Sequence, residues 1–157
     1  MKVHAAGLLS SVCFLLGCFA SARLYPVKGP LAEQTPPPIY AARAAAGIRS
    51  GSFTATLANG NKCSGQWTRV PKNPREGGAG APVANLAAAW DAVYGTGFYT
   101  ANVLGSNIHI EGQIPCSKGG TLHVEAVQHD IGGDKDTTLV IKGVASDDGG
   151  NIYKLAF

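Results

Sequence analysis

Charged residues are scarce in this 157-residue chain, at 15% of the total, and the formal net charge is only +3. A net charge this small is not the composition of a protein that binds nucleic acid. The sequence also lacks the G-x-S-x-G, H-E-x-x-H and phosphate-loop motifs of common enzyme classes. These absences remove any reason to assign a catalytic residue or a cofactor. They leave open an enzyme with a site of another kind.

No apolar run is clearly long enough to cross a membrane as a helix. The longest extends from Ala5 to Ala22 and has 18 residues, at the lower edge of the roughly 20 that a spanning helix needs. It follows the short positive start Met1-Lys2, as the apolar part of a secretory signal peptide does. We therefore expect the protein to be exported, with a retained transmembrane anchor as a marginal alternative.

The end of this run carries two competing cleavage sites. Leu15-Leu16-Gly17-Cys18 resembles the lipobox of bacterial lipoproteins. The resemblance implies that residues 1–17 are a signal peptide and that Cys18 is acylated and anchors the chain in a membrane. Phe19 follows the cysteine where an Asp would favour inner-membrane retention, which by the same resemblance favours the outer membrane in a host with two membranes. The alternative is ordinary cleavage after Ala20-Ser21-Ala22, which would release a soluble secreted protein.

A proline-rich stretch follows the cysteine. Five prolines lie between Arg23 and Pro38, and such sequences favour extended, semi-rigid conformations. We expect residues 18–38 to be the lipid anchor and a tether, and residues 39–157 to be a single globular domain. The segment RLYPVKGPL also resembles the post-cysteine segment of a set of uncharacterised exported bacterial lipoproteins, a resemblance that implies no activity.

Charge is unevenly distributed along the chain. Residues 19–75 hold eight Lys or Arg and one acid, a net charge of +7, whereas residues 76–157 have a net charge of −5. Cations near a membrane are attracted to anionic lipids by about 1 kcal/mol each. We expect the basic part to be either a solvated surface or a contact with an anionic envelope surface through Arg23, Lys28, Arg43 and Arg49.

Cleavage at either site leaves two cysteines, Cys63 and Cys116. An even number of cysteines in an oxidising compartment predicts a disulfide. The alternative is a metal site that also uses His123 and His129, but the spacings match no compact zinc motif. Neither cysteine has the local signature of a catalytic thiol.

The rest of the chain has the pattern of short strands. Residues 52–57 and 62–69 alternate in polarity on either side of Asn59-Gly60, a strong hairpin signal. The pattern places Cys63, Gly65 and Trp67 on one face, and Trp67 in the core. Further strands are expected at residues 107–114, 121–127, 137–144 and 151–157, whereas residues 41–46 are equally compatible with a helix or a strand.

One short helix interrupts the strands. Asn85 is a good N-cap, Gly95 a good stop, and Leu86, Trp90 and Val93 fall near one face. We therefore predict a mainly β fold: a small antiparallel sheet curled into a sandwich or partial barrel, with one short helix at about residues 86–94.

The remaining polar residues give weak functional signals. His123 and Glu125 share one face of a strand, which would permit acid–base chemistry, but the sequence shows no partner nucleophile. The acidic turns at residues 134–136 and 147–149 lack the calcium-loop pattern. We therefore expect no metal site and lean against an enzyme.

The expected function is that of a lipid-anchored cell-envelope protein with a non-catalytic binding, structural or accessory role. One alternative is a periplasmic or surface enzyme. The other is a small outer-membrane β-barrel, because the chain ends in an alternating strand with a terminal Phe157, although lipid-spanning strands need about 9–11 residues.

Overall fold

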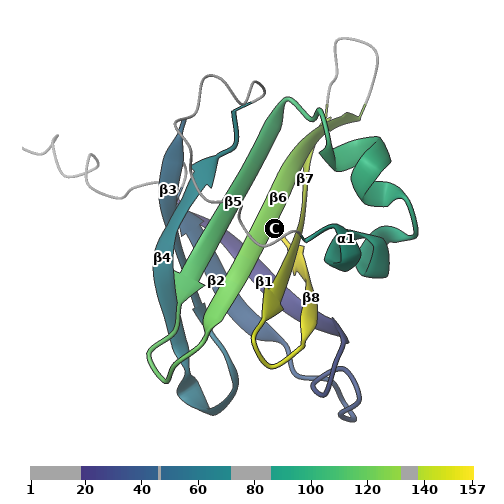
Figure 1. Ribbon diagram of the computed structural model, residues 1–157. Helices are drawn as coiled ribbons and strands as arrows, with labels where there is room; N and C mark the ends of the chain where they lie inside the picture. Colours follow the sequence, from purple (N-terminus) through teal and green to yellow (C-terminus); the bar gives the residue numbers. More distant parts are fainter. Residues whose placement is uncertain (1–18, 46, 72–85, 132–137) are drawn as a thin grey trace, which may run out of the picture.

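The computed structural model describes residues 19–45, 47–71, 86–131 and 138–157, without the side chains of residues 129–131 and 138–139. Eight antiparallel strands follow one another around a closed barrel, and β1 pairs with β8 to close it (Figure 1). The strands are β1 (Phe19–Lys28), β2 (Tyr40–Ala45), β3 (Ser50–Thr56), β4 (Lys62–Arg69), β5 (Ile108–Pro115), β6 (Thr121–Ile131), β7 (Thr138–Asp147) and β8 (Ile152–Ala156). The mainly β fold is confirmed, and its sheet closes completely.

The two ends of the barrel differ in their connections. The β1–β2, β3–β4, β5–β6 and β7–β8 connections share one end, which is the lower end in Figure 1 and is called the closed end below. The other end, called the open end, carries the start of β1, the end of β8 and the β2–β3 and β4–β5 connections. The β4–β5 connection includes the helix α1 (Ala87–Tyr94) and a short π-helix at Tyr99–Val103.

The predicted hairpin is formed by β3 and β4. Their register pairs Ser50 with Thr68 and Thr56 with Lys62. At the turn, Asn59 and Gly60 have φ values of 56° and 68°, in the left-handed region that Asn and Gly adopt most readily. The turn chemistry and the alternation of polarity therefore predicted this hairpin correctly.

The core fills the barrel interior. Alternate residues on each strand point inward, because side chains alternate between the two faces of a strand. Of the segment at residues 41–46, which the sequence leaves equally compatible with a helix or a strand, residues 41–45 belong to the strand β2. The fully or largely buried interior residues are Ala22, Leu24, Ala42, Ala44, Phe53, Ala55, Cys63, Trp67, Ile114, Leu122, Val124, Ala145, Tyr153 and Leu155.

The predicted tether is wrong for residues Phe19–Lys28, which form β1. Leu24 is completely buried, and β1 pairs with both β2 and β8. The prolines in this segment made the sequence pattern favour an extended tether over a strand. Pro26 is tolerated because the β1–β2 pairing ends at Leu24, so beyond that point β1 is paired on one side only, which is where strands accept proline.

The globular domain therefore begins before residue 39. The loop between β1 and β2 also belongs to it, because Leu31 packs against the core and its backbone N–H donates to Asn151 Oδ1 at 3.0 Å. The expected signal peptide at residues 1–17 and the expected lipid site at Cys18 lie outside the described residues.

Cys63 and Cys116 form the predicted disulfide. It joins β4 to the residue that follows β5 at the closed end, where the two cysteines are opposite each other as an isolated antiparallel bridge. Because both sulfurs are in this bond, the alternative in which they bind a metal with His123 and His129 does not hold.

The helix α1 lies outside the barrel against β7 and β8 (Figure 1). The helix prediction is confirmed to within one residue at its start, and the helix ends at Tyr94, which is followed by Gly95 with a φ of 105°. Asn85, the predicted cap, lies outside the described residues. A second apolar cluster forms between the helical connection and the barrel wall; its buried members are Leu86, Ala89, Trp90, Val103, Val127 and Val144.

Candidate functional site

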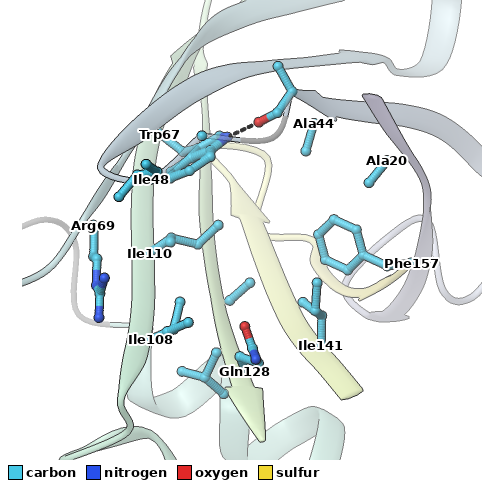
Figure 2. A pocket seen from close by; sticks show the side chains of 14 residues that line it. Ala20, Ala44, Ile48, Trp67, Arg69, Ile108, Ile110, Gln128, Ile141 and Phe157 are labelled. Carbon is cyan, nitrogen blue, oxygen red and sulfur yellow. Dashed lines mark hydrogen bonds between the residues drawn. The ribbon is translucent and has the colours of Figure 1, made fainter. Parts of the chain in front are cut away.

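An apolar cavity of about 410 Å³ lies at the open end of the barrel (Figure 2). Six strands and the β2–β3 connection contribute to its wall. The lining residues are Ala20, Ala44, Ala45, Gly47, Ile48, Trp67, Arg69, Ile108, Ile110, Ala126, Val127, Gln128, Ile141 and Phe157. Most of these side chains are hydrocarbon, so the cavity offers a ligand little besides apolar contact.

Small residues at inward positions create this space. Ala20, Ala44 and Ala126 occupy positions that point into the barrel, where Leu122 and Tyr153 fill the interior nearer the closed end. An eight-stranded barrel is just wide enough to be filled by side chains or to hold one small ligand. The alanines therefore leave space for a cavity at the open end of this barrel.

Trp67 belongs to both the core and the cavity wall. Only 6% of it is exposed, and its indole N–H donates to the Ala45 carbonyl at 3.2 Å (Figure 2). Its ring lies against Gly51, where an added Cβ would come within 2.6 Å of the ring and 2.4 Å of the Ala45 carbonyl oxygen. Only glycine at position 51 leaves room for the indole ring of Trp67 in this position. The prediction of Trp67 as a core residue is confirmed.

The mouth of the cavity is apolar with a basic residue beside it. Among the lining residues, Ile48 is 86% exposed, Ile141 is 44% exposed and Phe157 is 41% exposed. Arg69 is the one charged side chain among the lining residues, and its guanidinium donates to the Asn107 carbonyl at 2.8 Å. Ligand pockets of about 300–1,000 Å³ are commonly apolar with few polar groups, which is the character of this cavity.

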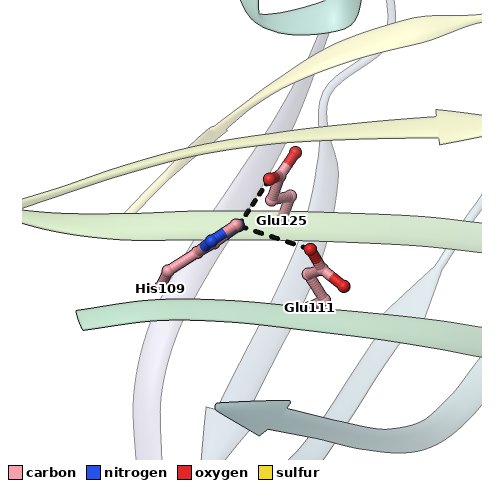
Figure 3. A group of neighbouring side chains, drawn as sticks. All are labelled: His109, Glu111 and Glu125. Carbon is pink, nitrogen blue, oxygen red and sulfur yellow. Dashed lines mark hydrogen bonds and ion pairs between the residues drawn. The ribbon is translucent and has the colours of Figure 1, made fainter. Parts of the chain in front are cut away.

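A cluster of His109, Glu111 and Glu125 lies on the outer face of the barrel (Figure 3). His109 and Glu111 are two residues apart on β5, and Glu125 on β6 is the direct cross-strand partner of Glu111. His109 Nε2 lies 2.5 Å from Glu125 Oε1 and 3.5 Å from Glu111 Oε1. One atom from each residue lies within 4.8 Å of the others.

The helical connection covers part of this cluster. The Trp90 indole N–H donates to Glu125 Oε2 at 2.6 Å, and Glu125 is only 3% exposed. Burial raises the pKa of Glu111; the Glu125 carboxylate adds to this increase, whereas His109 opposes it. Burial also raises the pKa of Tyr99, with a further increase from the carboxylates of Glu125 and Glu111.

His123 and Glu125, which the sequence placed on one face of a strand, interact with different partners. His123 is directed toward Asp148, with 3.9 Å between its Nε2 and Oδ1, and its Nδ1 is buried without a hydrogen-bond partner. Glu125 is paired with His109 instead. The side chain of His129 lies outside the described residues.

The acidic turn at residues 147–149 is occupied by structural contacts. Asp147 accepts hydrogen bonds from Asn151 and from the Tyr153 hydroxyl. Asp148 accepts one from the Thr121 backbone N–H at 2.9 Å. The similar segment at residues 134–136 lies outside the described part of the chain.

The four basic residues expected at an anionic surface do not form one patch. Arg23 and Arg43 are diagonal neighbours on the outer faces of β1 and β2. Arg49 is exposed in the connection between β2 and β3 at the open end, whereas Lys28 lies at the closed end of β1. Three of the four therefore lie toward the open end.

Comparison with known proteins does not assign this chain to a family. No protein-family model matches the chain, and searches of curated proteins and of solved structures find no significant match. Among the described residues, no helix is long and apolar enough to cross a membrane.

Sequence reasoning missed both the cavity and Glu111. The sequence carried a signal for each. The residues of β5 and β6 pair symmetrically about Lys118 in the connecting turn, which puts Glu111 opposite Glu125 once the register is assumed. The alanines at inward positions near the open end were the signal for unfilled space.

Proposed function

We propose that this is an exported protein, anchored to a membrane by a lipid on Cys18, whose barrel binds the acyl chain of a lipid in the open-end cavity. Its role is therefore binding, not catalysis. The observation that carries the proposal is the apolar cavity at the end of the barrel where β1 begins, one residue after Cys18. A lipid on Cys18 would hold this end of the barrel at the bilayer surface.

The surface at the open end supports this orientation. Phe19 and Ile48 expose apolar side chains there, and each buried methylene contributes about 0.8 kcal/mol to membrane binding. Arg49 is exposed beside them, and a cation near an anionic bilayer adds about 1 kcal/mol. An acyl chain leaving the bilayer would meet the cavity without crossing water.

The register of β1 favours cleavage before Cys18 over cleavage before Arg23. Of the six registered pairs between β1 and β2, four involve Phe19, Ala20, Ser21 and Ala22. Cleavage before Arg23 would remove these four residues, and with them most of one strand seam and part of the cavity wall.

The outer face of the barrel favours the anchored protein over an integral outer-membrane barrel. Arg23, Arg43 and Lys154 alternate with buried neighbours and point away from the interior. A lipid-facing barrel wall carries an apolar band outside, and charged residues at the bilayer midplane cost about 2–4 kcal/mol each. The larger apolar cluster of this barrel instead lies inside it, and the outward-facing Val127 and Val144 are covered by the helical connection.

The binding claim is tested with residues 19–157, which contain all eight strands. We expect a fluorescent fatty acid to bind with one site per chain. Ile108→Glu should weaken binding about ten-fold or more, because a carboxylate in the cavity must be desolvated beside the ligand. Fluorescence titration measures both affinities.

Gln113→Glu is the matched control. It adds the same charge to the same strand, but Gln113 is exposed on the outer face. We expect it to bind like the wild type, with circular dichroism confirming that both variants are folded. Equal affinities for the two variants, or no binding by the wild type, would show that the cavity is not the site.

A further inference from the structure

The outer cluster has a charge imbalance that its own residues do not correct. Glu111 and Glu125 are direct cross-strand partners, and like charges in that position destabilise a sheet. Glu125 is also almost completely buried, and a buried charge costs several kcal/mol unless it is well paired. Among the described residues, His109 is the ion-pair partner of both carboxylates. One imidazolium cannot neutralise two carboxylates, whereas a divalent cation can.

The donor atoms converge as metal ligands do. The distances from His109 Nε2 to the two carboxylate oxygens are 2.5 Å and 3.5 Å. These values bracket the roughly 3.3 Å between ligand atoms of a tetrahedral zinc site with bonds of about 2.0–2.1 Å. Figure 3 shows the imidazole nitrogen directed between the two carboxylates. The three donor atoms all lie within 4.8 Å of one another, so side-chain rotations would have to bring them to the tetrahedral spacing.

The surroundings of Glu125 are those of a metal-ligating carboxylate. Trp90 donates to Oε2, which leaves Oε1 directed at His109. Hydrogen bonds of this kind to the outer oxygen of a ligand fix its orientation and tune its affinity. On the opposite side, His109 and Glu111 are 12% and 22% exposed, so an ion and a water ligand could reach the cluster from solvent.

We propose that His109, Glu111 and Glu125 form a binding site for a divalent transition-metal ion, with Zn²⁺ as the best match. One imidazole and two carboxylates suit zinc, manganese or iron better than magnesium or calcium, which prefer oxygen ligands alone. Three protein ligands leave the fourth tetrahedral position for water. The site is separate from the interior cavity, because its residues face outward from β5 and β6.

The test uses the protein purified from cells, stripped with a chelator and titrated with Zn²⁺ alone by isothermal calorimetry. We expect one equivalent to bind and the melting temperature to rise, because an ion that binds the folded state stabilises it. Glu111→Gln removes one charged ligand from a partly exposed position and should weaken binding about ten-fold or more. His109→Asn should weaken Zn²⁺ binding to the same extent. It replaces Glu111→Gln as the test of the site if Glu111→Gln does not fold.

His123→Gln is the control for adventitious binding by histidine. His123 lies on the same outer face of β6 but outside the cluster, so its loss should leave the affinity unchanged. The proposal is overturned if Zn²⁺ does not bind, if folded Glu111→Gln or His109→Asn binds it normally, or if His123→Gln abolishes binding.

Discussion

At the scale of residues, Asp147 organises the closed end of the barrel. Its carboxylate accepts hydrogen bonds from the backbone and side chain of Asn151, each at 3.0 Å, and from the Tyr153 hydroxyl at 2.6 Å. Asn151 in turn accepts from the Leu31 backbone N–H. This network joins the β1–β2 loop to the β7–β8 hairpin, so the closed end is sealed by polar contacts as well as by the core.

Tyr153 should make the stability of the protein sensitive to alkaline pH. Its side chain is completely buried, and burial, together with the hydrogen bond to Asp147, raises its pKa well above 10. A raised folded-state pKa gives stability that is complete below the unfolded-state pKa, near 10, and declines above it. We therefore expect the free energy of unfolding to fall as the pH rises above about 10.

Tyr153→Phe separates this effect from general alkaline denaturation. The variant should be less stable at pH 8 by about 1–2 kcal/mol through the lost hydrogen bond, and its stability should fall less steeply above pH 10. Urea denaturation at several pH values measures both, with Tyr25→Phe on β1 as the control for losing one tyrosine. Parallel pH profiles for Tyr153→Phe and the wild type would contradict this explanation.

At the scale of elements, the local sequence pattern predicts a helix or strand correctly wherever the turn residues and the alternation of polarity agree. The β3–β4 hairpin was predictable because Asn59-Gly60 sets its turn, and α1 was predictable because alanines precede a glycine stop. The strand β1 was not predictable from its sequence. It accepts Pro26 only because the pairing between β1 and β2 ends at Leu24, and where that pairing ends is a property of the assembled sheet. The cluster at His109 likewise depends on the register between β5 and β6.

The disulfide should stabilise the seam between β4 and β5. That ladder registers only three residue pairs, from Trp67 to Arg69, and the Cys63–Cys116 bridge continues it toward the closed end. Replacing both cysteines with alanine should lower the free energy of unfolding by up to about 4 kcal/mol, the chain-entropy value for a loop of this length. Urea denaturation of the double variant measures the loss.

The reduced wild type is the matched comparison for that variant. Mild reduction should bring its unfolding midpoint close to that of the double alanine variant, since both lack the same cross-link. If thiol titration of the untreated protein finds two free cysteines, or if the double variant is as stable as the wild type, the disulfide has no such role.

At the scale of the whole molecule, the two ends of the barrel have different properties. The closed end holds the disulfide and the Asp147 network, whereas the open end holds the cavity, exposed Phe19 and Ile48, and the start of β1. The sequence indicated export and a β-rich domain but placed a tether between anchor and domain. With β1 starting at Phe19, a lipid on Cys18 would attach directly at the open end.

The intact mass of the mature protein, purified from native membranes without reductant, tests this account most directly. We expect a chain that begins at Cys18, carries added acyl mass and is two hydrogens lighter for its disulfide. An unmodified chain that begins at Arg23 would contradict the account, because it would lack both the anchor and the first four residues of β1.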